Sequence, residues 1–210
     1  MEDTLTYLRS MVVYDHHILQ MLDQEHRGRE DLQPFIEPEI GKLLSLLIRM
    51  NHVKRVLELG TGIGYSTIWI ACALRETGGR IVTIDNHRRT NCEARSMFAQ
   101  AGCDDIITLI EASAEEVLPE MAQREAGTYH MVFQDGGKQS YPLVYEDVCT
   151  LLAPGGILIA DDVLFPAEKD VRRGLKKPIE QFTAMLLKDS RFYTSVLPIG
   201  HGAAVSIKKG

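Results

Sequence analysis

The sequence has few cysteines, and none of them stands at metal-binding spacing. No two form a C-x-x-C pair, and none lies near a histidine in a zinc-site pattern. This pattern excludes the common zinc scaffolds and predicts free, small side chains in a reducing compartment. The cysteines are Cys72, Cys92, Cys103 and Cys149.

Long apolar runs are also missing. No stretch approaches the roughly 18–20 apolar residues that cross a bilayer, and residues 1–11 contain no apolar signal core. We therefore expect a cytoplasmic protein without a membrane partner. Basic residues are outnumbered 23 to 29 by acidic ones, and the formal net charge of −6 gives no general attraction to nucleic acid.

What the sequence does contain is enough apolar material for a full core. The chain has 210 residues, of which 45% are hydrophobic and 25% charged. It shows no internal repeat, linker or low-complexity tract. We predict one domain over residues 1–210.

The pattern of the chain changes near residue 51, from helices to strands that alternate with helices. Alternation of this kind needs crossover connections, which predicts an α/β fold with a mainly parallel, doubly wound, Rossmann-like sheet of seven strands and helices on both faces. Two final strands around a G-H-G turn predict a C-terminal antiparallel hairpin. Expected helices are 5–22, 40–50, 65–75, 89–101, 114–124, 141–152 and 178–188; expected strands are 56–59, 80–85, 106–110, 130–133, 156–160, 193–198 and 203–207.

A glycine-rich turn follows the first expected strand. Residues 58–64 read E-L-G-T-G-I-G, and the helix after them offers free N–H groups to an anion. Asp85 ends the next strand, where a carboxylate can accept hydrogen bonds from ribose hydroxyls. The glycine spacing lacks the G-x-x-G ending of dinucleotide sites, which favours a nucleoside ligand without a pyrophosphate. A plain strand-to-helix turn is the alternative.

These residues resemble motif I and the acidic loop of class I S-adenosylmethionine-dependent methyltransferases. The resemblance implies a glycine loop around the methionine part of the cofactor, a serine at its carboxylate and acidic groups at its amino group and ribose. The implied residues are Gly60, Gly62, Gly64, Ser66, Glu58 and Asp85.

Ser113 and Ala114 stand where that family places its loop around adenine. The usual acidic residue of this loop is replaced by Ser113, a weaker acceptor for an exocyclic amine. A capping box between Ser113 and Glu116 explains the same residues structurally, and the two roles are compatible.

Three carboxylates follow the last two parallel strands, namely Asp135, Asp161 and Asp162. Neighbouring strand ends meet at one edge of a doubly wound sheet, so these side chains should lie together. Hard oxygen ligands suit Mg²⁺, Mn²⁺ or Ca²⁺, and without a cation the carboxylates would repel one another. Independent helix caps or solvated loop acids are the alternative.

The segments around these aspartates resemble those of the magnesium-dependent, catechol O-methyltransferase-like family, with the patterns F-I-D-A-D-K and A-D-N-V-L. The resemblance implies that Asp135, Asp161 and Asp162 bind the metal, that Asp135 also contributes to catalysis and cofactor binding, and that Lys138 is the base. It further implies a cofactor lid at residues 38–44 and a homodimer. Without the aspartates, Lys138 would be an ordinary surface lysine on a turn.

Two departures from the family pattern matter for the chemistry. Asp162 replaces the usual asparagine, so the site carries one more negative charge and we expect tighter metal binding. Gly136 and Gly137 replace larger side chains, which widens the mouth of the acceptor site. Gln134 is polar where an apolar residue is usual, and nothing in the sequence explains it.

The leading prediction is therefore methyl transfer to a metal-bound hydroxyl of a small catechol-like aromatic, with helices of residues 1–51 contributing to the acceptor pocket. A transfer-RNA hydroxyuridine O-methyltransferase is the second possibility, because a basic run lies near the acceptor mouth. A non-catalytic S-adenosylmethionine-binding module is the third. The basic run comprises Lys169, Arg172, Arg173, Lys176 and Lys177.

Overall fold

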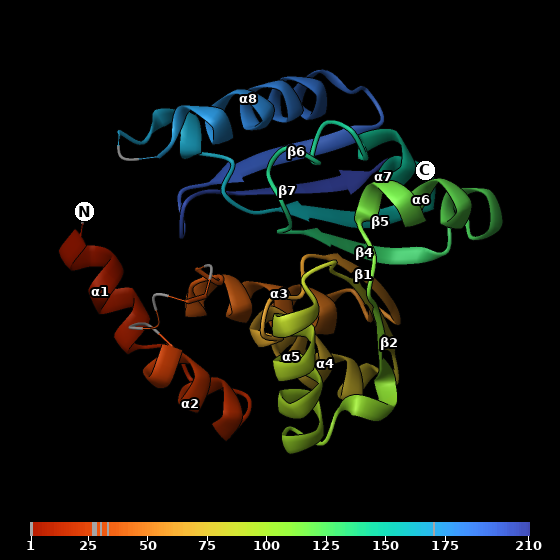
Figure 1. Ribbon diagram of the computed structural model, residues 1–210. Helices are drawn as coiled ribbons and strands as arrows, with labels where there is room; N and C mark the ends of the chain where they lie inside the picture. Colours follow the sequence, from red (N-terminus) through yellow and green to blue (C-terminus); the bar gives the residue numbers. More distant parts are fainter. Residues whose placement is uncertain (1, 27–28, 30, 33, 170) are drawn as a thin grey trace.

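The fold is seen in a computed structural model, which describes residues 2–26, 29, 31–32, 34–169 and 171–210. Seven strands form one sheet in the order β3-β2-β1-β4-β5-β7-β6 (Figure 1). The strands are β1 (Arg55–Leu59), β2 (Arg80–Ile84), β3 (Ile107–Ile110), β4 (Tyr129–Gln134), β5 (Leu152–Ala160), β6 (Phe192–Leu197) and β7 (Ala203–Lys208).

The strand pairings confirm the predicted fold class. The pairs from β3 through β5 are parallel, whereas β7 pairs antiparallel with both β5 and β6. The strand order reverses direction between β1 and β4, which creates the crevice where ligands bind in open α/β sheets.

Helices cover both faces of the sheet (Figure 1). One face packs on α3, α4 and α5, and the other on α6, α7 and α8. The helices are α1 (Glu2–Ser10), α2 (His17–His26), α3 (Pro38–Met50), α4 (Tyr65–Thr77), α5 (Arg88–Gln100), α6 (Ala114–Arg124), α7 (Tyr145–Leu151) and α8 (Arg173–Lys188), with short 3₁₀ turns η1 (Asp104–Ile106) and η2 (Phe165–Ala167).

Two helix starts differ from those predicted. The chain forms turns from Gly137 and enters α7 only at Tyr145, because Pro142 disfavours helical backbone at the residue before it. Conversely, α8 begins at Arg173 and includes Pro178, which was expected near the helix start. The expected helix over residues 5–22 is interrupted between Ser10 and His17, where Asp15 reaches α3 and accepts hydrogen bonds from Lys42 and Ser45.

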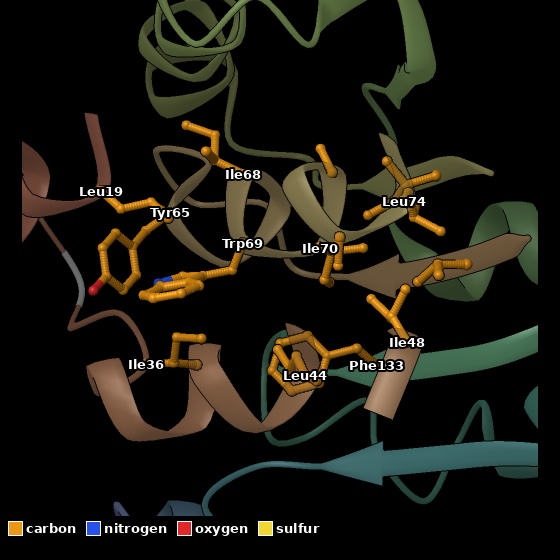
Figure 2. Packing of buried hydrophobic residues seen from close by; sticks show 14 of the residues in the cluster. Leu19, Ile36, Leu44, Ile48, Tyr65, Ile68, Trp69, Ile70, Leu74 and Phe133 are labelled. Atoms are coloured by element: carbon orange, nitrogen blue, oxygen red, sulfur yellow. The ribbon is translucent and has the colours of Figure 1, made fainter. Parts of the chain in front are cut away.

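The core under α3 and α4 is built around an indole ring. Trp69 is fully buried beside Tyr65, and Phe133 of β4 contacts the same layer next to Leu44 (Figure 2). A side chain at Gly41 would collide with the Trp69 ring, so the glycine lets α3 and α4 approach closely. This packing fixes α4, and with it the glycine loop that precedes it.

In the part of the chain that the structure describes, no helix is both long and apolar enough to cross a membrane.

Candidate functional site

A cavity of about 470 Å³ lies at the carboxyl ends of the central strands. Its walls come from the loops after β1, β2, β3 and β4, together with Asp31, Leu32, Pro34 and Phe35 before α3. The volume and position are those of a small-molecule site in an open α/β sheet. The predicted site residues that line it are Gly60, Gly62, Ser66, Asp85, Ser113, Ala114, Asp135 and Lys138.

The glycine loop is in direct contact with the loop after β4. Gly60 has a φ of 97°, and a Cβ there would lie 2.6 Å from the carbonyl oxygen of Asp135. Gly64 has a φ of 90° and precedes the first turn of α4. Glycine is therefore required at position 60 both for its backbone conformation and for the approach of Asp135.

Asp85 is fixed at the cavity wall by backbone donors. One carboxylate oxygen accepts from the N–H groups of Thr61 and Gly62, at 2.9 and 3.0 Å, and the other accepts from His87 N–H at 2.7 Å. The aspartate thus holds the glycine loop in place while facing the cavity, where the sequence predicts ribose hydroxyls.

Ser113 caps α6 and also lines the cavity. Its N–H donates to Glu116 at 3.2 Å in a capping box at the start of α6, and its side chain and Ala114 line the cavity. The capping interaction is confirmed, and the contact with adenine stays a prediction.

Glu58 lies behind the cavity instead of in its wall. It is fully buried and accepts hydrogen bonds from the hydroxyls of Ser66 and Thr67, at 2.6 and 2.5 Å. Burial raises the pKa of Glu58 to about 7. Ser66 lines the cavity at the second position of α4, where its backbone N–H has no partner within the helix and is available to a carboxylate.

The buried Glu58 carboxyl predicts a pH dependence of stability. Because its pKa is raised from 4.5 to about 7, the folded chain keeps a proton that the unfolded chain releases, so stability falls as pH rises through this window. Relative to Glu58→Gln, the wild-type free energy of unfolding should fall by about 3 kcal/mol as the pH rises from 4.5 to about 7. Urea unfolding from pH 4 to 8 measures the difference. An exposed control, Glu180→Gln, should retain the wild-type slope, and a wild-type slope in Glu58→Gln would contradict the assignment.

Residues just before α3 line the cavity, namely Asp31, Leu32, Pro34 and Phe35. The expected lid, residues 38–44, forms the first half of α3, and none of the described lining residues comes from it. Asp31 forms an ion pair with Arg89 of α5 at 2.9 Å, and Arg29, two residues before Asp31, pairs with Glu93 of α5 at 3.0 Å.

The predicted acidic cluster is assembled at the ends of β4 and β5. The Lys138 ammonium lies 2.8 Å from Asp135 and 2.6 Å from Asp162, and all three side chains are largely buried. Asp162 has a φ of 62°, a left-handed conformation that aspartate and asparagine tolerate better than other side chains with a Cβ. The backbone therefore accounts for a choice between these two residue types at this position.

Asp161 is the least satisfied member of the cluster. It is 3% exposed, and its Oδ1 has no hydrogen-bond partner among the described residues. Burial raises the pKa of Asp161 well above 3.8, and the charges of Asp135 and Asp162 raise it further. A buried carboxyl group in this position lacks a compensating cation of its own.

Lys138 is held as an ammonium in this arrangement. Burial alone would lower its pKa, but Asp135, Tyr141 and Asp162 together keep it well above 10.5. A base needs the opposite shift, so these contacts alone do not make Lys138 a base. Among the described residues, no three histidine, cysteine or acidic side chains are arranged as a ready metal site; Asp135 and Asp162 instead contact Lys138.

Helices of residues 1–51 were expected to contribute to the acceptor pocket, but several of their polar residues lie outside the described cavity lining. Asp15 pairs with Lys42 of α3, and the rings of His16 and His17 lie 4.4 Å apart. Tyr141 was not predicted, although its hydroxyl contacts Lys138 at 3.0 Å. Its spacing of three residues from Lys138 within a turn was the available signal.

Fold and site together define a class of protein. A glycine loop after β1, an acidic residue after β2 and a ligand cavity at the switch point are the arrangement of class I S-adenosylmethionine-dependent methyltransferases. Residues 9–209 match the model of the O-methyltransferase family, and the chain belongs to this family.

Comparison with known proteins supports the same assignment. The chain is 32% identical to mouse catechol O-methyltransferase domain-containing protein 1 over 206 residues, 96% of this chain and 78% of that protein. It is 33% identical to a catechol O-methyltransferase of Niastella koreensis over 129 residues, 61% of this chain and 58% of that protein. The O-methyltransferase TomG of Streptomyces achromogenes, solved in complex with SAM, superposes with a TM-score of 0.83 at 29% identity, covering 99% of this chain and 96% of that one. The chain is thus an S-adenosylmethionine-dependent O-methyltransferase.

Proposed function

We propose that this enzyme methylates one hydroxyl of an aromatic acceptor with two adjacent hydroxyls, and that a divalent cation binds at Asp135, Asp161 and Asp162. The observation that carries the proposal is the buried Asp161 carboxyl, whose Oδ1 lacks a partner in the described chain while two further carboxylates lie nearby. Three carboxylates with one ammonium leave a net negative charge in a largely buried site. A dication compensates that charge.

The chemistry of the donors fits the ion. All three candidate ligands are hard carboxylate oxygens, which suit Mg²⁺ best among common cations and also admit Mn²⁺ or Ca²⁺. Catechol, the acceptor in the name of the Niastella relative, carries two adjacent hydroxyls that could share one ion. The two glycines after Asp135 leave room for such a ring at the cavity mouth.

The enzyme's own residues supply binding, orientation and a proton acceptor. The glycine loop, Ser66 N–H and Asp85 hold the methyl donor beside the end of β4. A bound dication would supply the charge that lowers the proton affinity of two acceptor oxygens and holds them in place. With Asp135 and Asp162 engaged as ligands, Lys138 would lose its counterions, and its pKa would fall toward that of a base. Displacement at the methyl carbon needs little beyond alignment of the acceptor oxygen.

Methyl transfer from labelled S-adenosylmethionine tests this proposal directly. We expect transfer to catechols with adjacent hydroxyls, loss of transfer with a chelator, and recovery with Mg²⁺. Phenols with a single hydroxyl are the matched control and should be poor acceptors. Equal transfer to catechols and to single phenols would contradict the proposal.

Asp162 provides a test of the metal ligands. Asp162→Asn removes one negative charge, and we expect the affinity for Mn²⁺ to fall roughly tenfold. Isothermal titration of the metal-stripped protein measures this, with Asp161→Asn as a variant that should lose more affinity. Unchanged or tighter binding by Asp162→Asn would show that the extra carboxylate does not bind the ion.

A transfer-RNA acceptor is a second candidate, supported by the basic run after η2. Lys169, Arg172, Arg173 and Lys177 are exposed, although Lys176 instead donates to the Glu168 carbonyl oxygen. A phosphate-binding role would make transfer fall steeply with salt. The same labelled assay with transfer RNA, at 50 and 300 mM salt, separates this candidate from the small acceptor.

A further inference from the structure

Tyr141 is a buried tyrosine whose hydroxyl contacts Lys138 in the acidic cluster at the ends of β4 and β5. The side chain is fully buried, and its oxygen accepts a hydrogen bond from the Lys138 ammonium at 3.0 Å. The same hydroxyl lies 2.8 Å from the carbonyl oxygen of Gln134 and 3.2 Å from that of Asp161. These carbonyls mark the end of β4 and the first residue after β5, so the hydroxyl ties Lys138 to two rigid strand ends.

The ring of Tyr141 is fixed as firmly as its hydroxyl. It packs edge-on against Phe182 of α8, with ring centroids 5.1 Å apart and an interplanar angle of 80°. The Lys138 ammonium lies 5.0 Å from the centroid of the Tyr141 ring, within the range of a cation–π contact. The tyrosine therefore contacts Lys138 through both its oxygen and its ring, and it cannot turn away without disturbing the packing on α8.

The contact of Tyr141 with Lys138 is important because of the other groups that surround the ammonium. The ammonium has three N–H donors, and three groups surround it: it donates hydrogen bonds to Asp135 and to the Tyr141 hydroxyl, and it forms an ion pair with Asp162. Two of the three are the carboxylates proposed to bind the metal. The tyrosine is the one acceptor of this set that carries no charge and has no part in metal binding.

We propose that Tyr141 is a positioning residue for Lys138, holding its Nζ at the ends of β4 and β5 when Asp135 and Asp162 turn to another partner. The inference rests on the proposed function, in which Lys138 takes the acceptor proton. A lysine side chain has four rotatable bonds, and without a neutral anchor it would lose its place once the carboxylates are engaged. Misplacement of a reacting group by about 1 Å costs on the order of 100-fold in rate.

Tyr141→Phe tests the proposal because it keeps the ring and removes only the hydroxyl. We expect kcat to fall by about 10- to 100-fold, with the KM for the acceptor and the Kd for S-adenosylmethionine within twofold of wild type. Tyr145→Phe is the matched control: Tyr145 also packs edge-on against Phe182, but its hydroxyl donates to Asp189 at 2.8 Å, away from the cavity. It should lose a comparable buried hydrogen bond and keep its kcat.

A double-mutant cycle separates positioning from a general structural role. If Tyr141 acts through Lys138, adding Tyr141→Phe to Lys138→Met should lower the residual rate by less than twofold. A full 10-fold further loss in the Lys138→Met background, or a wild-type kcat in Tyr141→Phe alone, would overturn the proposal.

A second readout does not depend on turnover. In protein saturated with Mg²⁺, acylation of Lys138 by an amine-directed reagent, followed by mass spectrometry, should be several-fold faster in Tyr141→Phe than in wild type or Tyr145→Phe. Without the ion, Asp135 and Asp162 also hold the ammonium, and the three proteins should label alike. Equal labelling of all three proteins in the presence of the ion would contradict the anchoring role. Absence of catechol methylation by the wild type, together with faster labelling in Tyr141→Phe, would reject the proposed acceptor and leave the positioning of Lys138 intact.

Discussion

Replacing Asp161 by alanine is expected to lower kcat/KM for a catechol by at least about 100-fold and to weaken divalent-cation binding by a similar factor. The Asp161 carboxyl is buried and its Oδ1 has no hydrogen-bond partner among the described residues, so the substitution removes one of the three proposed metal ligands. The measurements are initial rates of methyl transfer at saturating S-adenosylmethionine and titration of the metal-stripped protein with Mn²⁺.

The stability of the variants distinguishes a lost ligand from a damaged fold. The pKa of Asp161 is raised, so the charged form is unfavourable in the metal-free protein, and stability is lost as pH rises above the usual carboxyl range. Metal-free Asp161→Asn should therefore be at least as stable as wild type at pH 8 while remaining inactive. An exposed control, Asp104→Asn, should match wild type in both measurements. An Asp161→Asn enzyme with full activity and normal metal affinity would exclude Asp161 as a ligand.

Replacing Lys138 by methionine is expected to change rate and metal affinity in opposite directions. Loss of the base should lower kcat by about 10²- to 10⁴-fold. The ammonium lies within 2.8 Å of both Asp135 and Asp162 in the metal-free arrangement, so it competes with a cation for these carboxylates. Its removal should therefore tighten Mn²⁺ binding.

Lys138→Arg gives the complementary result. Arginine keeps the positive charge and cannot give up its proton, so kcat should be as low as in Lys138→Met while metal affinity is not improved. Lys188→Met, on the exposed surface of α8, is the control for loss of a lysine. If Lys138→Met kept a wild-type kcat, the base would have to be another group.

Much of the fold could be predicted because the strand pattern and the helix pattern of the sequence indicate the same architecture. The strand runs around Val56, Ile81 and Val132 are short, apolar and separated by helices, which leaves few alternatives to a parallel sheet. Helix starts were less predictable where proline was involved. Pro142 delays α7, whereas Pro178 is accommodated inside α8, and only the surrounding packing decides between these outcomes.

The sequence could predict which residues lie together at the strand ends, but not how their side chains pair. The rule that parallel strand ends converge placed Asp135, Asp161 and Asp162 together, as the structure does. Which side chains pair within the cluster depends on rotamers and neighbours, so the ion pair of Lys138 with Asp162 could not be foreseen, whereas the spacing of Tyr141 from Lys138 was a signal for their contact.

The sequence also could not predict which segment before or within α3 lines the cavity, for a similar reason. Residues 38–44 belong to a regular amphipathic helix, and the packing of this helix on Trp69 already explains their apolar pattern. The irregular segment before α3, with Phe35 and Asp31, has no periodicity to predict where it lies. Its position depends on long-range ion pairs such as that of Arg89 with Asp31.

We propose that methyl transfer depends on one divalent ion bound by buried carboxylates. Titration of metal-stripped wild-type enzyme with Mg²⁺ or Mn²⁺ during methyl transfer to a catechol tests this dependence. We expect negligible transfer without the ion and a rate that saturates at one tightly bound ion per chain. Full activity of the stripped enzyme, unchanged by added ion, would contradict it.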